Sequence, residues 1–213
     1  MFTRNLDFVL GQGLREVERR NGKVSGRFYH GFKHSSMVVE AVLTLALRAG
    51  LSIETRNLVV IAAAWHDVEQ SLGSGKNEEE SGRQASEFMG KNGYSEMEMR
   101  VVQSLISGTV CTWTDGVMHQ QAENMDYVAK LLADADLCSL GASHEDFAEM
   151  SLRLMAELAK KPISTLTREE LLGGWKNQVR FMTGRKFLTA EANVLMGKQF
   201  LENLEYAKKM AGL

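Results

Sequence analysis

The stretch Leu58-Val59-Val60-Ile61-Ala62-Ala63-Ala64-Trp65-His66-Asp67 places a histidine and an aspartate at the end of an unbroken apolar run. A helix that is apolar on every side is typical of a protein interior. We therefore predict a buried central helix at about residues 54–67, with Ser52 as its N-cap. Buried polar groups are normally hydrogen-bonded. His66 and Asp67 thus either have ordinary partners in the core or belong to a functional site.

Apolar residues on both sides of this stretch recur with the spacing of amphipathic helices. Helices are predicted at about residues 4–20, 34–49, from 77, and at 96–108, 124–139, 144–160, 168–183 and 190–210. Three residue pairs have capping-box spacing at predicted helix starts: Asn77 with Glu80, Ser95 with Glu98, and Thr167 with Glu170. Ser143 and Thr189 are predicted as simple N-caps.

No alternating strand pattern of useful length is present, so residues 22–31, 71–76 and 111–122 are predicted to be loops. The fold class is predicted to be all-α, a single-domain bundle of about eight to ten helices over residues 1–213. The motifs described below lie at about residues 27–141, and helices at about 143–210 complete the bundle.

Composition excludes several classes of function. The formal net charge of −2 gives no basic footprint for duplex nucleic acid. No run approaches the roughly 20 apolar residues that span a bilayer. The N-terminal residues lack the apolar core of a signal peptide, and Cys111 and Cys138 show no metal spacing, so we expect reduced cysteines and a cytoplasmic protein.

Two further segments carry residues of the same kind as His66 and Asp67. They are Tyr29-His30-Gly31-Phe32-Lys33-His34 and Leu131-Leu132-Ala133-Asp134-Ala135-Asp136-Leu137. Imidazole nitrogens and carboxylate oxygens are the ligands of hard or borderline divalent metals. Neighbours on an ideal helix point ~100° apart, so His66 and Asp67 could share one metal only where their helix ends. Asp134 and Asp136 should point to opposite faces, and spacing alone does not say which is the ligand.

The order His, then His-Asp, then Asp on a helical chain resembles the HD superfamily of metal-dependent phosphohydrolases, most closely the small bacterial HD hydrolases. The resemblance covers about residues 27–141 and includes Asn77-Glu78-Glu79-Glu80-Ser81 after the His-Asp pair. It implies that His34, His66, Asp67 and Asp136 are metal ligands, with Asp134 in reserve. It also implies that Glu78 is an acidic residue near the site, although capping is the alternative for this Glu run.

The chain departs from the pattern at two places. Thr112 stands where relatives often carry a further histidine, and His119 lies in the following predicted loop. We therefore expect one divalent ion, Mn²⁺, Fe²⁺, Mg²⁺, Ni²⁺ or Co²⁺. Gln70 stands where some HD enzymes carry a catalytic acid, with Glu69 beside it.

This site predicts hydrolysis of a phosphate ester or anhydride, with a nucleotide or another small phosphorylated metabolite as the substrate. A metal lowers the pKa of its bound water, and Asp67 or Glu78 would accept the water proton. We expect His30, Lys33 and Gln70 to contact the substrate. Arg185 and Lys186 are either further cations of the site or an exposed interhelical turn.

Two other functions stay open at this stage. One is a non-catalytic HD module that binds a nucleotide or partner, and the other is an iron-dependent oxygenase of HD type. A homodimer is a further candidate, because apolar residues of the last predicted helix pack either on the core or on a second copy. These residues are Leu195, Phe200, Leu201 and Leu204.

Overall fold

The structure is a computed structural model that describes residues 5–22, 26–115 and 117–213. The predicted helix start at residue 4 and parts of the predicted loops at 22–31 and 111–122 lie outside these ranges. The elements are α1 (Leu6–Asn21), α2 (Phe32–Arg48), α3 (Ile53–Trp65), α4 (Lys76–Lys91), α5 (Glu96–Ser107), β1 (Cys111–Thr114), β2 (Val117–Gln120), α6 (Tyr127–Asp136), α7 (His144–Ala159), α8 (Arg168–Met182) and α9 (Ala190–Ala211). Short 3-10 helices lie at Gln121–Asn124, Cys138–Gly141 and Ile163–Thr165. The predicted all-α fold class is confirmed, with one small hairpin as an exception.

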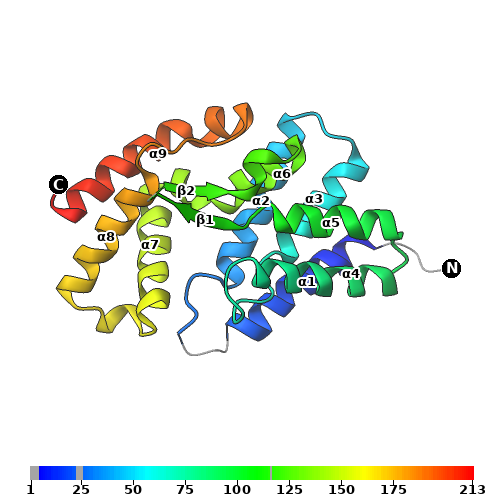
Figure 1. Cartoon of the computed structure of the whole chain (residues 1–213), viewed down its shortest axis with the longest axis horizontal. Helices are drawn as coiled ribbons and strands as arrows, with labels where there is room; N and C mark the ends of the chain where they lie inside the picture. The colour runs from blue at the N-terminus through cyan, green and yellow to red at the C-terminus, as the bar shows by residue number, and fades with distance from the viewer. Residues whose placement is uncertain (1–4, 23–25, 116) are drawn as a thin grey trace.

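The predicted central helix is α3, whose residues from Val59 to Trp65 are all buried. It packs against α1, α2 and α5. Helices α7, α8 and α9 gather on the other side of the molecule, and α2, α6 and the hairpin lie between the two groups (Figure 1). The apolar core therefore surrounds the element that ends at His66 and Asp67.

Most predicted caps are confirmed, because local side chains accept the free amides of a helix start. Ser52, Ser143 and Thr189 each accept from the backbone three residues on. Ser95 with Glu98, and Thr167 with Glu170, form the predicted capping boxes.

The predicted cap of α4 is wrong. The helix begins one residue earlier, and the carboxylate of Glu78 accepts from the Gly75 amide at 2.6 Å. Asn77 instead accepts from the Leu72 and Gly73 amides at 2.8 and 3.0 Å, which shapes the preceding loop. Gly75 adopts a φ of 84°, a conformation that favours glycine.

The predicted loop at residues 111–122 is also wrong. Residues Cys111–Thr114 and Val117–Gln120 pair as an antiparallel hairpin, with Cys111 opposite Gln120. Exposed and buried residues alternate in β2, but over four residues this signal is short. The side chain of Arg185 supports the hairpin from the segment between α8 and α9, and it donates to the Met118 carbonyl at 3.0 Å.

The predicted helix at 124–139 is interrupted. α6 begins after its cap Asp126 and ends at Asp136, and a separate 3-10 turn follows. α3 also ends two residues before the predicted position, at Trp65. Asp136 is therefore the last residue of its helix, while His66 and Asp67 lie just beyond theirs.

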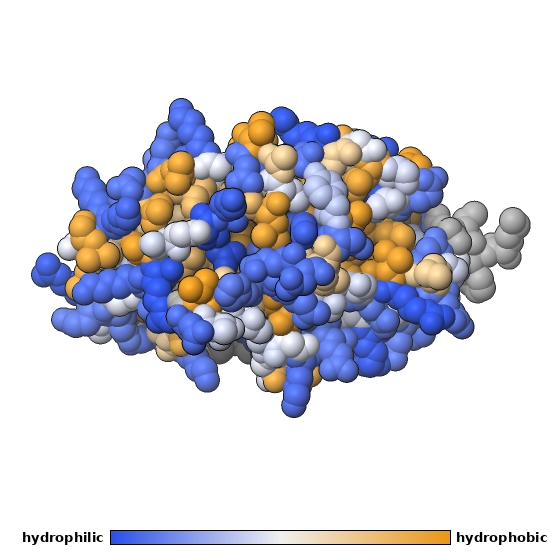
Figure 2. All heavy atoms as spheres, turned by 45° about the horizontal axis from the view of Figure 1, so that its top comes forward, coloured by the Kyte–Doolittle hydropathy of each residue, from blue (hydrophilic) through white to orange (hydrophobic). Residues whose placement is uncertain are grey.

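The surface view in Figure 2 shows polar side chains with scattered apolar patches between them. On α9, Phe200 is buried and packs against Phe187, whereas Leu195 and Leu201 are exposed. The helix thus uses part of its apolar face for the core, and the homodimer stays a prediction. Among the residues that the structure describes, none of the helices combines the length and apolar character that crossing a bilayer requires.

Candidate metal centre

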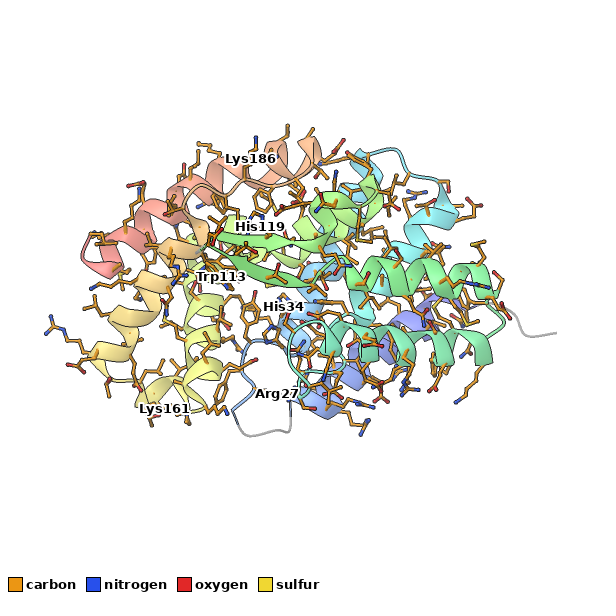
Figure 3. The ribbon with its side chains drawn as sticks, viewed as in Figure 1. Arg27, His34, Trp113, His119, Lys161 and Lys186 are labelled. Carbon is orange, nitrogen blue, oxygen red and sulfur yellow. The ribbon has the colours of Figure 1, made fainter. Side chains whose placement is uncertain are left out.

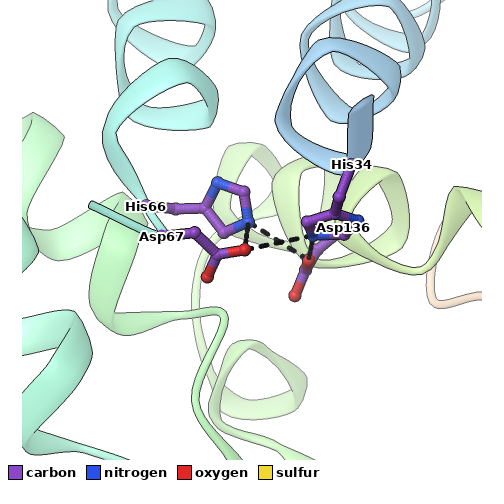
Figure 4. A group of neighbouring side chains, drawn as sticks. All are labelled: His34, His66, Asp67 and Asp136. Atoms are coloured by element: carbon purple, nitrogen blue, oxygen red, sulfur yellow. Dashed lines mark hydrogen bonds and ion pairs between the residues drawn. The ribbon is translucent and has the colours of Figure 1, made fainter. Parts of the chain in front are cut away.

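The four side chains predicted as metal ligands come together in one group (Figure 4). His34 lies in the first turn of α2, His66 and Asp67 follow α3, and Asp136 ends α6. One ligand atom from each residue can be chosen so that all four atoms lie within 4.8 Å of one another. Among the described residues, this is the one such group of His, Cys, Asp or Glu side chains.

The two imidazoles face the two carboxylates at short distances. His34 Nε2 lies 3.2 Å from Asp67 Oδ2 and 3.1 Å from Asp136 Oδ1. His66 Nε2 lies 3.0 Å from Asp67 Oδ2 and 3.3 Å from Asp136 Oδ1. Each nitrogen therefore faces both oxygens, as four ligands of one ion would.

Two sequence neighbours at the end of α3 point into one space. The helix stops at Trp65, and its C-cap His66, which keeps helical angles (φ −58°, ψ −34°), begins the turn that carries Asp67. His66 Nε2 lies 3.0 Å from Asp67 Oδ2 across this turn. The buried side chain of Asn21 fixes this turn, since its Nδ2 donates to the Asp67 carbonyl at 2.9 Å. Arg27 in turn donates to Asn21 Oδ1 at 3.0 Å.

The hydrogen bonds of His66 test whether a cation fits. Its Nδ1 lies 2.7 Å from the Ala63 carbonyl, so Nδ1 carries a hydrogen. The neutral ring then presents a lone pair at Nε2, toward Asp67 and Asp136. Within the described part of the chain, His66 Nε2 and Asp67 Oδ2 are buried and have no hydrogen-bond partner. Two nitrogens and two carboxylate oxygens aimed at one space fit a divalent ion.

The two carboxylates of the cluster, those of Asp67 and Asp136, are stabilised by positive charge beside them. Burial lowers the pKa of His66, but the carboxylates of Asp67 and Asp136 outweigh burial and hold it well above its ordinary value. Burial raises the pKa of Asp67, yet the rings of His66 and His30 outweigh it and hold that pKa well below the usual range. The pKa of Asp136 is lowered for the same reason, by His34 and His66 against burial. Either protonated imidazoles or a metal ion supply this charge.

Gln70, predicted to contact the substrate, lies beside Asp67. Its Nε2 donates to Asp67 Oδ1 at 2.7 Å, which leaves Oδ2 facing the histidines. Asn77 Nδ2 donates to Gln70 Oε1 at 3.4 Å from the start of α4.

Glu78 serves as a cap and also faces the charge of the site. Burial raises the pKa of its carboxyl, and the negative charges of Asp67 and Asp136 raise it further, against hydrogen bonds from the backbone. The capping alternative for Glu78 is thus real, and it does not exclude a role in proton transfer.

His30 has a partner that the sequence did not indicate. Its Nδ1 lies 2.5 Å from Glu157 Oε1, and Glu157 Oε2 accepts from the amides of Tyr29 and His30 at 2.7 and 3.1 Å. The rings of His30 and His34 lie 5.9 Å apart. Burial lowers the pKa of His30, but Asp67 and Glu157 outweigh it and raise the pKa. Glu157 comes from α7, 127 residues away, and no local signal pointed to it.

Other predicted residues lie elsewhere. Lys33 Nζ binds Glu149 at 2.6 Å and Asp146 at 3.4 Å, because the start of α2 faces α7. His119 lies on the hairpin, away from His34 in Figure 3, and its Nδ1 is 3.1 Å from Glu123.

Asp134 is buried, but its carboxylate binds the segment before α9 and not the candidate ligands. It accepts from the Leu188 and Thr189 amides at 2.7 and 2.8 Å and from the Thr189 hydroxyl at 2.7 Å. Asp134 therefore holds the start of α9, and the structure brings Asp136 into the cluster. Arg185, the other candidate cation, donates to the hairpin.

A cavity of about 850 Å³ opens beside the cluster. Asp136, Tyr29 and His30 line one part of it, and residues of α7, α8, β1 and the 3-10 turn after α6 line the rest. Trp113 stands on β1 at this side of the molecule (Figure 3).

The architecture is similar to a known structure, the phosphodiesterase domain of Salpingoeca rosetta rhodopsin phosphodiesterase. The two chains share a fold. The TM-score is 0.63 at 17% sequence identity, and the match covers 96% of this chain and 80% of that chain. No protein-family model matches the sequence. No curated protein matches it either.

Proposed function

We propose that the chain is a metal-dependent phosphohydrolase of HD type that acts on small phosphate esters. The convergence of His34, His66, Asp67 and Asp136, with unpartnered buried atoms facing one another, carries the proposal. The shared fold with a phosphodiesterase domain supports the same class of reaction.

The donor set defines the cofactor that the proposal requires. His34 and His66 offer nitrogens and Asp67 and Asp136 offer oxygens for one divalent ion, Mn²⁺, Fe²⁺, Mg²⁺, Ni²⁺ or Co²⁺. Such an ion, when bound, lowers the pKa of a water and stabilises negative charge on a phosphoryl group.

Glu78 is the better proton acceptor of the two carboxylates considered. A general base works best when its pKa approaches the working pH, and the pKa of Glu78 is raised whereas that of Asp67 is lowered. Asp67 is then a ligand, oriented by Gln70.

His30 is the candidate proton donor to the departing oxygen, whereas Glu78 is the candidate acceptor of the water proton. Glu157 binds its Nδ1, and Nε2, which has no hydrogen-bond partner among the described residues, can contact a ligand in the cavity that His30 lines. Because the pKa of His30 is raised, the protonated ring would bind a phosphate oxygen or give its proton to the departing oxygen.

Metal analysis of protein purified without chelator, followed by phosphate release with each candidate ion, tests the proposal. We expect close to one ion per chain and turnover that depends on it. Metal binding without turnover of any phosphate ester would favour the non-catalytic module. Oxygen consumption with Fe²⁺, in place of phosphate release, would favour the oxygenase.

A further inference from the structure

The cavity beside the metal cluster is larger than a phosphoryl group requires. Its volume of about 850 Å³ lies in the range of sites for small organic ligands, roughly 300–1,000 Å³. We call the part between α7, α8 and β1 the ester pocket. A phosphoryl group at Asp136 would leave this pocket for the rest of the substrate.

The ester pocket has few charges. Among the described residues that line the cavity, Arg180 is the one lysine or arginine, and its guanidinium lies 4.6 Å from the ring centroid of Trp113. The carboxylate of Glu170 is paired with Lys161 at 2.6 Å. Phosphates are usually bound by several charge-assisted hydrogen bonds, so the pocket is poorly suited to a chain of phosphates.

The walls are mostly apolar. Met150, Leu154 and Met155 come from α7, Phe181 from α8 and Trp113 from β1. Burial of an aromatic or aliphatic group against such side chains removes apolar surface from water and so favours the complex.

Two uncharged polar side chains complete the pocket. Ser151 and Gln178 are only 4% and 8% exposed, and they line the cavity from α7 and α8. Neither side chain is hydrogen-bonded to another described residue, and their polar atoms are not among the buried atoms without a partner, so they are available to water or a ligand in the cavity.

From these observations we infer that the ester pocket binds the uncharged, largely apolar organic group of an ester with a single phosphoryl group. This inference rests on the proposed function, since it places the phosphoryl group at the metal centre. Hydrolysis breaks the bond from phosphorus to the ester oxygen and forms one from phosphorus to the water oxygen. One water proton ends on the departing oxygen, which gives the free alcohol.

Gly173 offers a test that spares the metal centre. It lines the cavity from α8, and a Cβ atom added there meets no heavy atom within 4 Å. The Cβ of Gly173→Phe therefore fits, and its ring should narrow the ester pocket. Gly197→Phe on α9 is the matched control, because Gly197 is no part of the cavity wall and a Cβ there would lie 3.9 Å from Asn193 Oδ1.

The assay compares 1-naphthyl phosphate, methyl phosphate and inorganic triphosphate with Mn²⁺ present. We expect kcat/KM to be highest for 1-naphthyl phosphate. Gly173→Phe should raise its KM about tenfold or more, the effect of losing ~1.4 kcal/mol of contact, and leave methyl phosphate unchanged. Gly197→Phe should change neither value. Naphthol and methanol differ in how readily they leave phosphorus. Comparing the variants with wild type on the same substrate keeps this difference out of the result.

The outcomes separate the inference from the proposed function. Turnover that favours triphosphate, or a KM for 1-naphthyl phosphate that Gly173→Phe does not change, overturns the inference and leaves a phosphohydrolase. If nothing is hydrolysed, calorimetry measures the binding of 1-naphthyl phosphate instead. Binding that is weakened in Gly173→Phe and unchanged in Gly197→Phe supports the inference about the ester pocket, while the proposed hydrolase function fails. Absence of binding to the Mn²⁺-loaded protein overturns the inference.

Discussion

Gln70 donates its side-chain amide hydrogen to Oδ1 of Asp67 at 2.7 Å. The bond satisfies one oxygen of the carboxylate and leaves Oδ2, which has no hydrogen-bond partner among the described residues, toward His34 and His66. The position where some HD enzymes have a catalytic acid thus orients a candidate ligand in this chain.

Gln70→Leu tests this orienting role. It removes the hydrogen bond but keeps a side chain of similar size, so Asp67 should rotate more freely. Loss of such an outer partner typically lowers metal affinity about 10–100-fold, and we expect a change of that order in a calorimetric Mn²⁺ titration. Gln84→Leu is the control, because Gln84 donates to Glu80 on α4. Equal affinities for wild type and Gln70→Leu would contradict the assignment.

Asp67 and Asp134 should respond differently to loss of charge. Asp67→Asn should abolish measurable metal binding and hydrolysis while circular dichroism stays helical. Asp134→Asn should keep metal affinity but lower the melting temperature, because Asp134 accepts three hydrogen bonds at the start of α9. The opposite pattern, with metal lost only in Asp134→Asn, would overturn the ligand assignment.

The pair of His30 and Glu157 predicts a pH-dependent stability. The pKa of Glu157 lies below its ordinary 4.5, because the bond and charge of His30 outweigh burial. Its contribution is therefore full above pH 4.5 and is lost as the pH falls through the lowered value. The pKa of His30 lies above its ordinary 6.5, so its contribution is full below pH 6.5 and is lost as the pH rises through the raised value.

Glu157→Gln should consequently lower the melting temperature most between about pH 4.5 and 6.5, by about 2–6 °C for a chain of this size. Thermal unfolding of metal-free wild type and variant from pH 4 to 9 measures the difference. Glu149→Gln on the same helix is a suitable control, since Glu149 pairs with Lys33 and Arg153 rather than with a histidine. A difference that does not vary with pH would show that the pair is not ionised.

The features that were predicted correctly from the sequence, the central helix and most helix caps, depend on residues close together in the chain. α3 is apolar all round, and Ser52, Ser95 and Thr167 cap the helices that follow them, so short-range patterns were sufficient. The grouping of the four candidate ligands came from the resemblance of their order along the chain to the HD superfamily, and the structure places those side chains together.

Long-range contacts account for what the sequence did not predict. Spacing could not choose between Asp134 and Asp136, because the choice depends on where the start of α9 packs, more than 50 residues away. Glu157 reaches His30 through the packing of α7, and the exposed face of β1 gave no apolar pattern. Lys33 was predicted to contact the substrate, and its ion pairs with Asp146 and Glu149 were not predicted because these partners lie on a different helix.

Arg185 should control the stability of the β1–β2 hairpin, which two four-residue strands alone would hold weakly. Its guanidinium donates to the Met118 carbonyl at 3.0 Å and to Gln120 Oε1 at 3.3 Å, and it lies 4.8 Å from the ring centroid of Phe181.

Arg185→Leu keeps apolar contact with Phe181 but leaves both oxygens without this donor, at a cost typical of a lost hydrogen bond to a charged group, about 1.5–3 kcal/mol. We expect hydrogen exchange in residues 111–120 to become about tenfold faster or more, while Mn²⁺ affinity stays unchanged because the cluster lies on other elements. Lys186→Leu is the matched control, since it removes an exposed cation from the same segment. Unchanged exchange in Arg185→Leu, or equal acceleration in both variants, would show that the hairpin is held by its own ladder and not by Arg185.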